Sequence, residues 1–450
     1  MSAPATVQHS RVIDIVGTQN VVTDAQGVGA YSVDGIAPQI VARPASAQEV
    51  SEIVKFAAAE KLAVISTAAR TKLGIGMPPA RYDLAIDMTR LDRVISYDPG
   101  DLTLSVEPGI PLSRLAEVLA EHNQFLPLDV PFYDRATVGG TLASGVDSPL
   151  RQAYGTARDF VLGMEFVSGD GALAKSGGRV VKNVSGYDLH KLFLGSIGSL
   201  GVITRVNFKT FPLPRNTASF VAGFASVDAA ANFNALIQGS PLRCQSVEIF
   251  SPQAAAIFNA SQKYDHWSVA VSIAGNDGVI ERAQRDLETM AHNATPNSLR
   301  EFRRFEGSDE KHLWLTIREF PVIATSTRDA AIFKLSGLPT SIAALCNATA
   351  AIIERHSFEM AHAFHGSGVG HLSLSARYGG AGQLKSCCEE IFDTAAKLAA
   401  YTSVPWCPLE LKRWLSTWGP PREDFVLMQR VKRAFDPHNV FAPGRFVGGL

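Results

Sequence analysis

The chain carries one stretch whose residue types and spacing suit the holding of a ligand, between residues 182 and 203. It reads Lys-Asn-Val-Ser-Gly-Tyr-Asp-Leu at 182–189 and Gly-Ser-Ile-Gly-Ser-Leu-Gly-Val-Ile at 195–203. Closely spaced glycines let a backbone approach a bulky planar or phosphorylated ligand, because no Cβ stands in the way. A glycine-rich turn that serves only tight packing has the same spacing, so at this level both interpretations stay open.

Two upstream segments extend the pattern. Ala-Thr-Val-Gly-Gly-Thr-Leu-Ala at 136–143 places adjacent glycines after a hydroxyl residue, and Tyr154 and Gly155 are followed at short distance by Arg158 and Asp159. An ordered series of such segments is more specific than a single glycine motif.

Hydrophobic patterns indicate which elements position these residues. Residues 39–44 and 62–65 predict strands, and the capping-box sequence at 46–49 predicts the start of a helix between them. The loop after this β-α-β unit lies at the end of a strand, where nucleotide phosphates tend to bind. Short apolar runs and turns at 125–205 predict antiparallel sheet, and residues 216–410 alternate helical and strand patterns, which predicts a second α+β domain.

Composition bounds the class of protein. The 450 residues exceed what one hydrophobic core usually organises, and 46% hydrophobic with 19% charged residues is typical of a globular protein with a sizeable core. A net charge of −1, from 42 basic and 43 acidic residues, offers no global field for nucleic acid or anionic lipid. We therefore expect no nucleic-acid partner.

Cellular location is inferred from what the sequence lacks. No export signal opens the chain and no run of eighteen apolar residues occurs, so we expect no membrane span. The five cysteines form no CxxC pair, which predicts reduced thiols in a cytoplasmic protein and excludes an iron–sulfur cluster ligated in the usual closely spaced way.

Taken in chain order, the glycine-bearing segments resemble the flavin-binding fold of the vanillyl-alcohol oxidase and p-cresol methylhydroxylase superfamily. Within it, the chain resembles the FAD-binding subunits of bacterial glycolate oxidase over nearly its whole length. The resemblance rests on residues 154–163, on residues 182–189, and on Phe-Asp-Pro-His-Asn-Val-Phe-Ala-Pro-Gly-Arg-Phe at 435–446.

This resemblance implies an α+β fold in three parts. Residues 1–215 form a two-subdomain FAD-binding domain of the p-cresol methylhydroxylase type, residues 216–410 form an α+β cap on the substrate side, and residues 411–450 form a C-terminal strap that returns to the flavin domain. FAD is expected to bind non-covalently. The cofactor-binding residues expected on this basis are Thr67, Ala68, Ala69, Arg70, Thr71, Pro127, Asp129, Thr137, Val138, Gly139, Gly140, Ser144, Tyr154, Gly155, Tyr187, Gly198, Gly201, Val202, Ile203 and Arg445.

The sequence departs from the family in the loop after the first β-α-β unit. Residues 66–72 read Ser-Thr-Ala-Ala-Arg-Thr-Lys, with alanines and Arg70 where glycines are expected. Alanine does not adopt positive φ cheaply, and its Cβ occupies space near the phosphates. Arg70 and Lys72 could supply charge to a pyrophosphate instead, or the loop has decayed because FAD is held weakly or not at all.

A second departure lies at 364–371, where relatives acting on D-2-hydroxy acids carry histidine, aspartate and asparagine around the glycines. Here Phe364, Ser367 and Val369 stand at those positions and His371 remains. His362 or His365 could pair with His371 around a metal, but no further ligand stands out. The favoured interpretation is that these histidines are polar residues that flank a glycine turn, and no metal is assigned.

The resemblance implies an FAD-dependent oxidoreductase that oxidises a small D-2-hydroxy acid, glycolate or D-lactate, by hydride transfer to flavin. No residue is a persuasive catalytic base. The expected partners are a flavin-containing catalytic sister subunit and an iron–sulfur subunit, which could hold this cytoplasmic chain at the inner face of the membrane. Two alternatives stay open: a non-catalytic assembly subunit with a vestigial flavin pocket, and a stand-alone D-lactate dehydrogenase.

Overall fold

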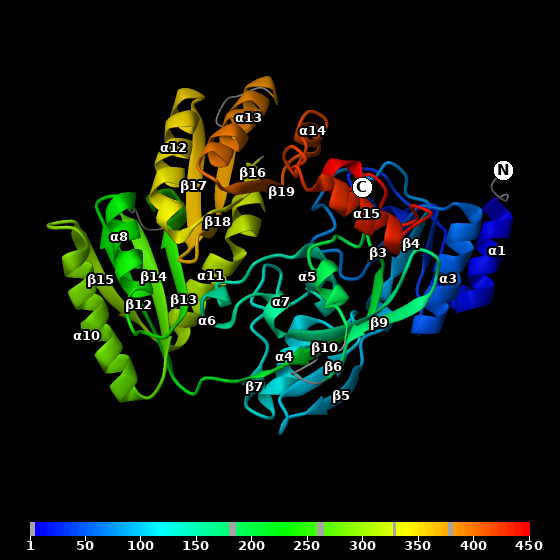
Figure 1. The fold of residues 1–450 in the computed structure, drawn as a ribbon, viewed down its shortest axis with the longest axis horizontal. Helices are drawn as coiled ribbons and strands as arrows, with labels where there is room; N and C mark the ends of the chain where they lie inside the picture. Colours follow the sequence, from blue (N-terminus) through cyan, green and yellow to red (C-terminus); the bar gives the residue numbers. More distant parts are fainter. Residues whose placement is uncertain (1–4, 180–185, 259–264, 327–329, 377–380) are drawn as a thin grey trace.

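The computed structural model describes residues 5–179, 186–258, 265–326, 330–376 and 381–450. Half of the predicted segment 182–189, residues 182–185, therefore lies outside the described residues. Figure 1 shows two bodies side by side, with the N-terminal part of the chain and the C-terminal segment together in one and the middle of the chain in the other.

The first sheet of the N-terminal body has four strands in the order β1 (Val21–Val22), β2 (Ile40–Ala42), β4 (Leu84–Asp87) and β3 (Val64–Thr67). Strands β2 and β3 both run parallel to β4, which lies between them, so the predicted β-α-β unit closes around a third strand. Its helix α3 (Ala47–Glu60) begins as predicted, because the Ser46 hydroxyl accepts the backbone N–H of Glu49. Helices α1 (Ala5–Val16) and α2 (Ala25–Gly29) precede it.

The second sheet is antiparallel, as the glycine- and turn-rich pattern predicted. Its order is β5 (Val94–Asp98), β6 (Thr103–Val106), β10 (Val202–Lys209), β8 (Val161–Val167) and β9 (Leu173–Gly177). A short sheet pairs β7 (Gln124–Phe125) with β11 (Phe211–Pro212). The helices of this region are α4 (Leu112–Ala120), α5 (Val138–Ser144), α6 (Arg151–Tyr154) and α7 (Ala157–Phe160).

The middle of the chain builds one eight-stranded antiparallel sheet. Its order is β15 (Leu299–Phe305), β12 (Thr217–Phe224), β14 (Trp267–Ala274), β13 (Cys244–Phe250), β17 (Phe358–His365), β18 (Val369–Ala376), β16 (Ala330–Ser336) and β19 (Tyr401–Trp406). One face packs on α8 (Val227–Gln238), α10 (Asp277–Ala294), α12 (Ile342–Arg355) and α13 (Ala381–Lys397). The other face packs on α9 (Pro252–Phe258) and α11 (Gly307–Ser326) and looks toward the N-terminal body.

The C-terminal segment returns to the N-terminal body. After α14 (Leu409–Lys412) comes α15 (Phe425–Phe435), and the chain then runs beside β3, where the backbone of Val64 bonds both Val440 and Ala442. The division into residues 1–215, 216–410 and 411–450 stays a proposal, which the sheet order supports.

Candidate active site

A small cavity lies between the loop after β3, the helix α5 and the C-terminal segment. We call it the loop cavity; its volume is about 70 Å³, room for about two water molecules. Many of the residues predicted to bind the cofactor line it. These are Thr67, Ala68, Ala69, Arg70, Thr71, Thr137, Gly140, Ser144 and Arg445, joined by Ser66, Lys72, Leu73, Ile75, Ala143 and Ile197.

The loop cavity presents unused hydrogen-bond donors. Within the described part of the chain, the backbone N–H groups of residues 69–72 donate no hydrogen bond. The buried hydroxyl of Thr67 also has no partner there. Buried polar groups are nearly always paired, so such a group marks a place that is completed by something else. Free amides at the end of a parallel strand are suited to phosphate oxygens.

The loop cavity is also basic. Arg70, Lys72 and Arg445 are among the described residues that line it, and none of those lining residues is acidic. Lys72 is buried and its ammonium donates to the carbonyl of Pro131 at 2.9 Å. Burial lowers the pKa of Lys72 to about 8, although Glu319 acts in the opposite direction. A cation with two further N–H donors therefore stands at the cavity.

Arg445 lines the loop cavity and also holds the loop in place. Its guanidinium donates to the carbonyls of Leu73 at 2.5 Å and Ile75 at 2.7 Å, and burial lowers its pKa to about 10. Arg445 therefore clamps the C-terminal segment onto the loop, which fixes the loop's shape.

In the loop after β3, a position where glycine was expected is occupied by Arg70, whose side chain stabilises the backbone conformation there. Arg70 alone among residues 67–72 has a positive φ, 59°, a conformation that costs an L-residue about 1 kcal/mol relative to glycine. Its guanidinium stacks 4.3 Å from the centre of the Tyr31 ring and lies 3.9 Å from the Asp87 carboxylate. Stacking on Tyr31 and the nearby charge of Asp87 hold Arg70 in a backbone conformation that glycine adopts more easily.

The glycine pair of α5 does not offer its amides to the cavity. Gly139 donates to the carbonyl of Pro108 at 2.7 Å, and Gly140 donates to the Thr137 hydroxyl at 3.4 Å. A Cβ on Gly139 would lie 2.6 Å from the Cβ of Pro108, so this glycine is required for close packing. Val138 belongs to the hydrophobic core.

The other predicted cofactor residues lie outside the lining. Gly198 approaches the loop, since an added Cβ would meet the Ser66 hydroxyl at 3.1 Å. Gly201, Val202 and Ile203 are buried where β10 begins, and Gly155 makes a tight turn at φ 74°. Tyr187 is 89% exposed, so its side chain does not contribute to the loop cavity as it stands.

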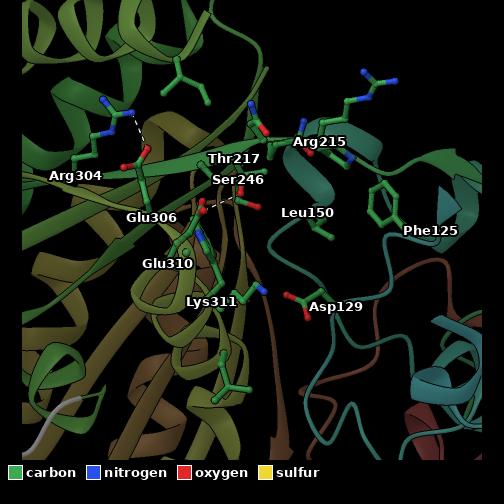
Figure 2. A pocket seen from close by; sticks show the side chains of 18 of the residues that line it. Phe125, Asp129, Leu150, Arg215, Thr217, Ser246, Arg304, Glu306, Glu310 and Lys311 are labelled. Carbon is green, nitrogen blue, oxygen red and sulfur yellow. Dashed lines mark hydrogen bonds and ion pairs between the residues drawn. The ribbon is translucent and has the colours of Figure 1, made fainter. Parts of the chain in front are cut away.

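A much larger cleft, of about 860 Å³, separates the N-terminal body from the eight-stranded sheet. Figure 2 shows Phe125, Asp129 and Leu150 on one side and Thr217, Glu310 and Lys311 on the other. Two further residues predicted to bind the cofactor belong to this region: Asp129 lines the cleft, and buried Pro127 lies on the same segment. Tyr154 reaches across the boundary and donates to Gln245 at 2.7 Å.

Asp129 meets a cation from α11. Arg318 donates to it at 2.8 Å and also pairs with Glu319 at 3.0 Å. Burial raises the pKa of the Asp129 carboxyl, and Arg318 acts against that shift. The same α11 carries Glu310, a buried carboxylate that accepts the hydroxyls of Thr217 and Ser219, each at 2.7 Å.

A row of polar side chains leads from this cleft across the sheet. It crosses neighbouring strands on the face toward α11, where alternate strand residues point the same way. Ser219 pairs with Ser272 and Ser272 with Ser246, all of them buried. Glu248 follows Ser246 on the same face of β13, and its partner on β17 is His365.

The row ends in what we call the interface cluster: Asp147, Arg151, Glu248, Lys334, His365 and His371. Asp147 follows α5 and pairs with Arg151 at 2.5 Å and with Lys334 of β16 across the domain boundary. Burial opposes ionisation of Asp147, but Lys334, Arg151 and His365 outweigh it and lower the pKa of its carboxyl to about 2.

Two histidines of the predicted 364–371 segment join the interface cluster. The Nδ1 atom of His365 contacts the Glu248 carboxylate, whereas its buried Nε2 has no partner among the described residues. His371 stands with its ring centre 6.5 Å from that of His365, and burial, helped by His365 and Lys334, lowers the pKa of His371 to about 3. His362 points to the opposite face, where its ring nitrogen meets the Thr349 hydroxyl at 2.9 Å.

Sequence reasoning missed Glu248 and Lys334, which lie far from the histidines in the chain. The available signal was a charged residue inside an apolar strand, as in Val247-Glu248-Ile249. Over the described ranges, no group of three or more His, Cys, Asp and Glu side chains could hold a metal ion. In the same ranges, no helix is both long and apolar enough to cross a membrane.

Comparison with known proteins places this geometry in a family. A model of the FAD binding domain matches residues 38–177, and a model of the C-terminal domain of FAD linked oxidases matches residues 213–401 and 415–446. The glycolate oxidase subunit GlcD of Bacillus subtilis is 23% identical over 97% of this chain and 95% of its own length.

Two relatives match over a shorter stretch. The glycolate oxidase subunit GlcE of Escherichia coli is 36% identical over 38% of this chain and 49% of its own length. A D-2-hydroxyglutarate dehydrogenase of Xanthomonas citri is 29% identical over 48% of this chain and 46% of its own length.

Among solved structures, p-cresol methylhydroxylase superposes with a TM-score of 0.77 at 16% identity, covering 98% of this chain and 96% of that one. This likeness shows the fold, as the sequence predicted. The two family models, the relatives and the shared fold agree, and the chain belongs to the FAD-linked oxidases, which are FAD-dependent oxidoreductases with a fold of the p-cresol methylhydroxylase type.

Proposed function

We propose that the chain is the FAD-binding subunit of a glycolate oxidase-like complex that oxidises small D-2-hydroxy acids, glycolate or D-lactate. The observation that carries this proposal is the loop cavity, where residues 69–72 offer free amides and Arg70, Lys72 and Arg445 supply positive charge. A dinucleotide pyrophosphate carries the negative charge and the acceptor oxygens that such a site requires.

The residues present fit the cofactor by their chemistry. The amides of 69–72, the Thr67 hydroxyl and the Lys72 ammonium would hold the pyrophosphate. Bound FAD supplies a two-electron acceptor for the α-hydrogen of a hydroxy acid. The loop cavity, at about 70 Å³, has room for only part of such a cofactor.

The large cleft supplies the approach for substrate. It lies between the body that contains the loop cavity and the sheet that carries the interface cluster. Lys334 and Arg151 are the cations there that could hold a substrate carboxylate, and Arg318 is the corresponding cation on α11. Enclosure by both bodies would keep water from the reacting carbon.

The relatives' names favour a complex of several subunits. We propose a flavin-containing catalytic sister subunit and an iron–sulfur subunit as partners, because no closely spaced cysteine motif occurs in this sequence to hold an acceptor cluster. We further propose a cytoplasmic location, with the partner subunits holding the chain at the inner face of the membrane.

A titration tests the proposal. The purified chain is mixed with FAD, binding is followed by flavin fluorescence, and the loaded protein is then mixed with glycolate or D-lactate without oxygen. Bound FAD that is bleached at its visible bands supports the proposal. A chain that binds no FAD contradicts it, and reduction of a dye by D-lactate without partners would instead identify a stand-alone D-lactate dehydrogenase.

One observation favours the second candidate, a non-catalytic assembly subunit with a vestigial pocket. Two cations at the boundary between the bodies are already paired with carboxylates of the N-terminal body, Lys334 with Asp147 and Arg318 with Asp129. An anionic substrate must compete with these carboxylates. Bound FAD that no hydroxy acid reduces would support this candidate.

A further inference from the structure

The interface cluster holds an arrangement that the proposed function has not used. Glu248 and His365 are both buried, with side chains 3% and 8% exposed, and the carboxylate contacts Nδ1 of the imidazole. A carboxylate on Nδ1 fixes the tautomer and the orientation of the ring and leaves Nε2 as the acceptor. Nε2 is buried and has no partner among the described residues, so it is free to accept a hydrogen bond from a ligand.

The charges around His365 indicate which ligand belongs there. The Asp147 carboxylate bridges Arg151 and Lys334. His371 is the remaining titratable neighbour and pairs in register with Lys334. The position of the Asp147 carboxylate is therefore one where a carboxylate group can bind: two cations contact it, and the free imidazole nitrogen of His365 belongs to the same cluster. We call this position the carboxylate seat.

The position of this seat links it to both cavities. Asp147 follows the helix whose residues Ala143 and Ser144 line the loop cavity. Leu150, next to Arg151, lines the large cleft, and so does Ser246, on the same face of β13 as Glu248. Neighbours of the interface cluster therefore line the large cleft on one side and the loop cavity on the other.

We propose that His365, oriented by Glu248, accepts the hydroxyl proton of the substrate, and that the substrate carboxylate takes the place of Asp147 beside Lys334. This inference rests on the proposed function and names the substrate class as a small 2-hydroxy monocarboxylate. It also assigns to Asp147 an inhibitory role, because the internal carboxylate and the substrate compete for the same cations.

The chemistry balances with the flavin as oxidant. The O–H bond of the substrate breaks and its proton goes to Nε2, so the dyad becomes an imidazolium beside a carboxylate. The C–H bond on the α-carbon breaks, and the hydrogen leaves with its electron pair to the oxidised flavin, which is reduced by two electrons. The carbon–oxygen double bond of a 2-oxo acid forms.

The first test compares buried histidines of one strand. FAD-loaded His365→Gln is mixed with D-lactate without oxygen, and flavin reduction is expected to slow by about a hundredfold, with loss of the acidic limb of the pH profile. Glu248→Gln is expected to slow reduction by about tenfold and to shift that limb. His362→Gln is the matched control, because His362 bonds Thr349 on the opposite face of β17; it is expected to keep the wild-type pH profile.

The second test needs no turnover. Oxalate, a carboxylate probe that cannot be oxidised at an α-carbon, is titrated into FAD-loaded wild type and Asp147→Asn, and binding is followed by perturbation of the flavin spectrum and by thermal stabilisation. Removal of the internal carboxylate is expected to tighten oxalate binding at least tenfold. Equal affinity in the two proteins overturns the exchange of carboxylates.

The two tests separate this inference from the proposed function. If the flavin of the wild type is reduced, and the flavin of His365→Gln is reduced at the same rate and with the same pH profile, the role of His365 and Glu248 is overturned and the proposed function stands. A wild type that binds FAD but is reduced by neither glycolate nor D-lactate overturns the proposed function, and the oxalate titration then still decides whether Asp147 occupies a carboxylate seat.

Discussion

The loop cavity and the interface cluster place positive charge at the same boundary in opposite ways. Around the loop cavity, Lys72 bonds only a neutral carbonyl and the loop amides are free. In the interface cluster, Lys334 and Arg151 already share the carboxylate of Asp147. A buried cation without a counter-ion is costly, whereas a paired one is tolerated.

This difference separates two kinds of anion site. The loop cavity gains stability only when an anion arrives from outside, which is appropriate for a cofactor that stays bound. The interface cluster is stable without a ligand, so an arriving anion must displace an internal one, which is appropriate for a substrate that comes and goes. The predictions below test each half of this comparison.

The largest effect is expected from Asp147→Asn. Removing the buried carboxylate leaves Lys334 and Arg151, both half-buried, near each other without a counter-ion. The free energy of unfolding should fall by about 3 kcal/mol, as measured in urea at pH 7. Asp92→Asn is the control, because its pair with Arg114 at 2.7 Å is exposed and should contribute under about 1 kcal/mol.

The pH dependence sharpens this prediction. The pKa of Asp147 is lowered to about 2 in the folded protein, from an ordinary value of 3.8. The stabilisation is therefore present above about pH 4 and is lost as the pH falls toward 2, with an amplitude of about 2 kcal/mol. Wild type and Asp147→Asn should converge in stability over that range; curves that stay parallel would show that the pair contributes no net stability.

Lys72→Met should have the next largest effect and should act on cofactor binding. Loss of a buried charged donor to phosphate costs about 2 kcal/mol, so the Kd for FAD should rise about thirtyfold, as measured by flavin fluorescence. Lys55→Met is the control, since Lys55 is exposed and pairs only with Glu52. A Kd unchanged by Lys72→Met, with a shifted flavin midpoint potential, would place the charge at the flavin ring instead.

The two glycines of α5 should differ. Gly139→Ala brings a Cβ within 2.6 Å of Pro108 and should lower the free energy of unfolding by about 1.5 kcal/mol. Gly140→Ala meets only the Thr137 hydroxyl, at 3.2 Å, and should change stability less and FAD affinity more. The ratio of the two effects, from urea unfolding and FAD titration, decides which glycine faces the ligand.

The smallest expected effect is the pH dependence of FAD affinity. The pKa of Lys72 is lowered to about 8 from 10.5, so the residue is charged at pH 7 and loses its proton as the pH rises through 8. The Kd for FAD should therefore increase up to about tenfold between pH 8 and 9, and Lys72→Met should show a flat profile. A wild-type profile that is equally flat contradicts a role for this proton.

Local patterns predicted most of the fold. The capping box at Ser46, the alternation of β10 and the helical face of α10 all became the predicted elements, because each depends on residues close in sequence. Many of the residues that line the loop cavity were predicted from the resemblance, because segments that occur in the same order along the chain indicate the fold of the family. Tyr187 is exposed, and its contact with the flavin stays a prediction, because its neighbours in sequence do not determine where a loop side chain points.

The interface cluster could not be predicted from the sequence. Glu248 and His365 are 117 positions apart, and their contact depends on the register of β13 against β17. Asp147 and Lys334 come from different bodies, and their pairing depends on how those bodies dock. No local propensity encodes either contact, and a lone charged residue in an apolar strand was the only sign of one of them.

The clamp made by Arg445 has a consequence for the time at which the protein becomes functional. Its bond to Ile75 joins residues 370 positions apart, so a nascent chain on the ribosome carries the loop long before the residue that shapes it. The loop therefore takes its shape only after Arg445 has left the ribosome, and a chain interrupted ahead of Val440 should be colourless.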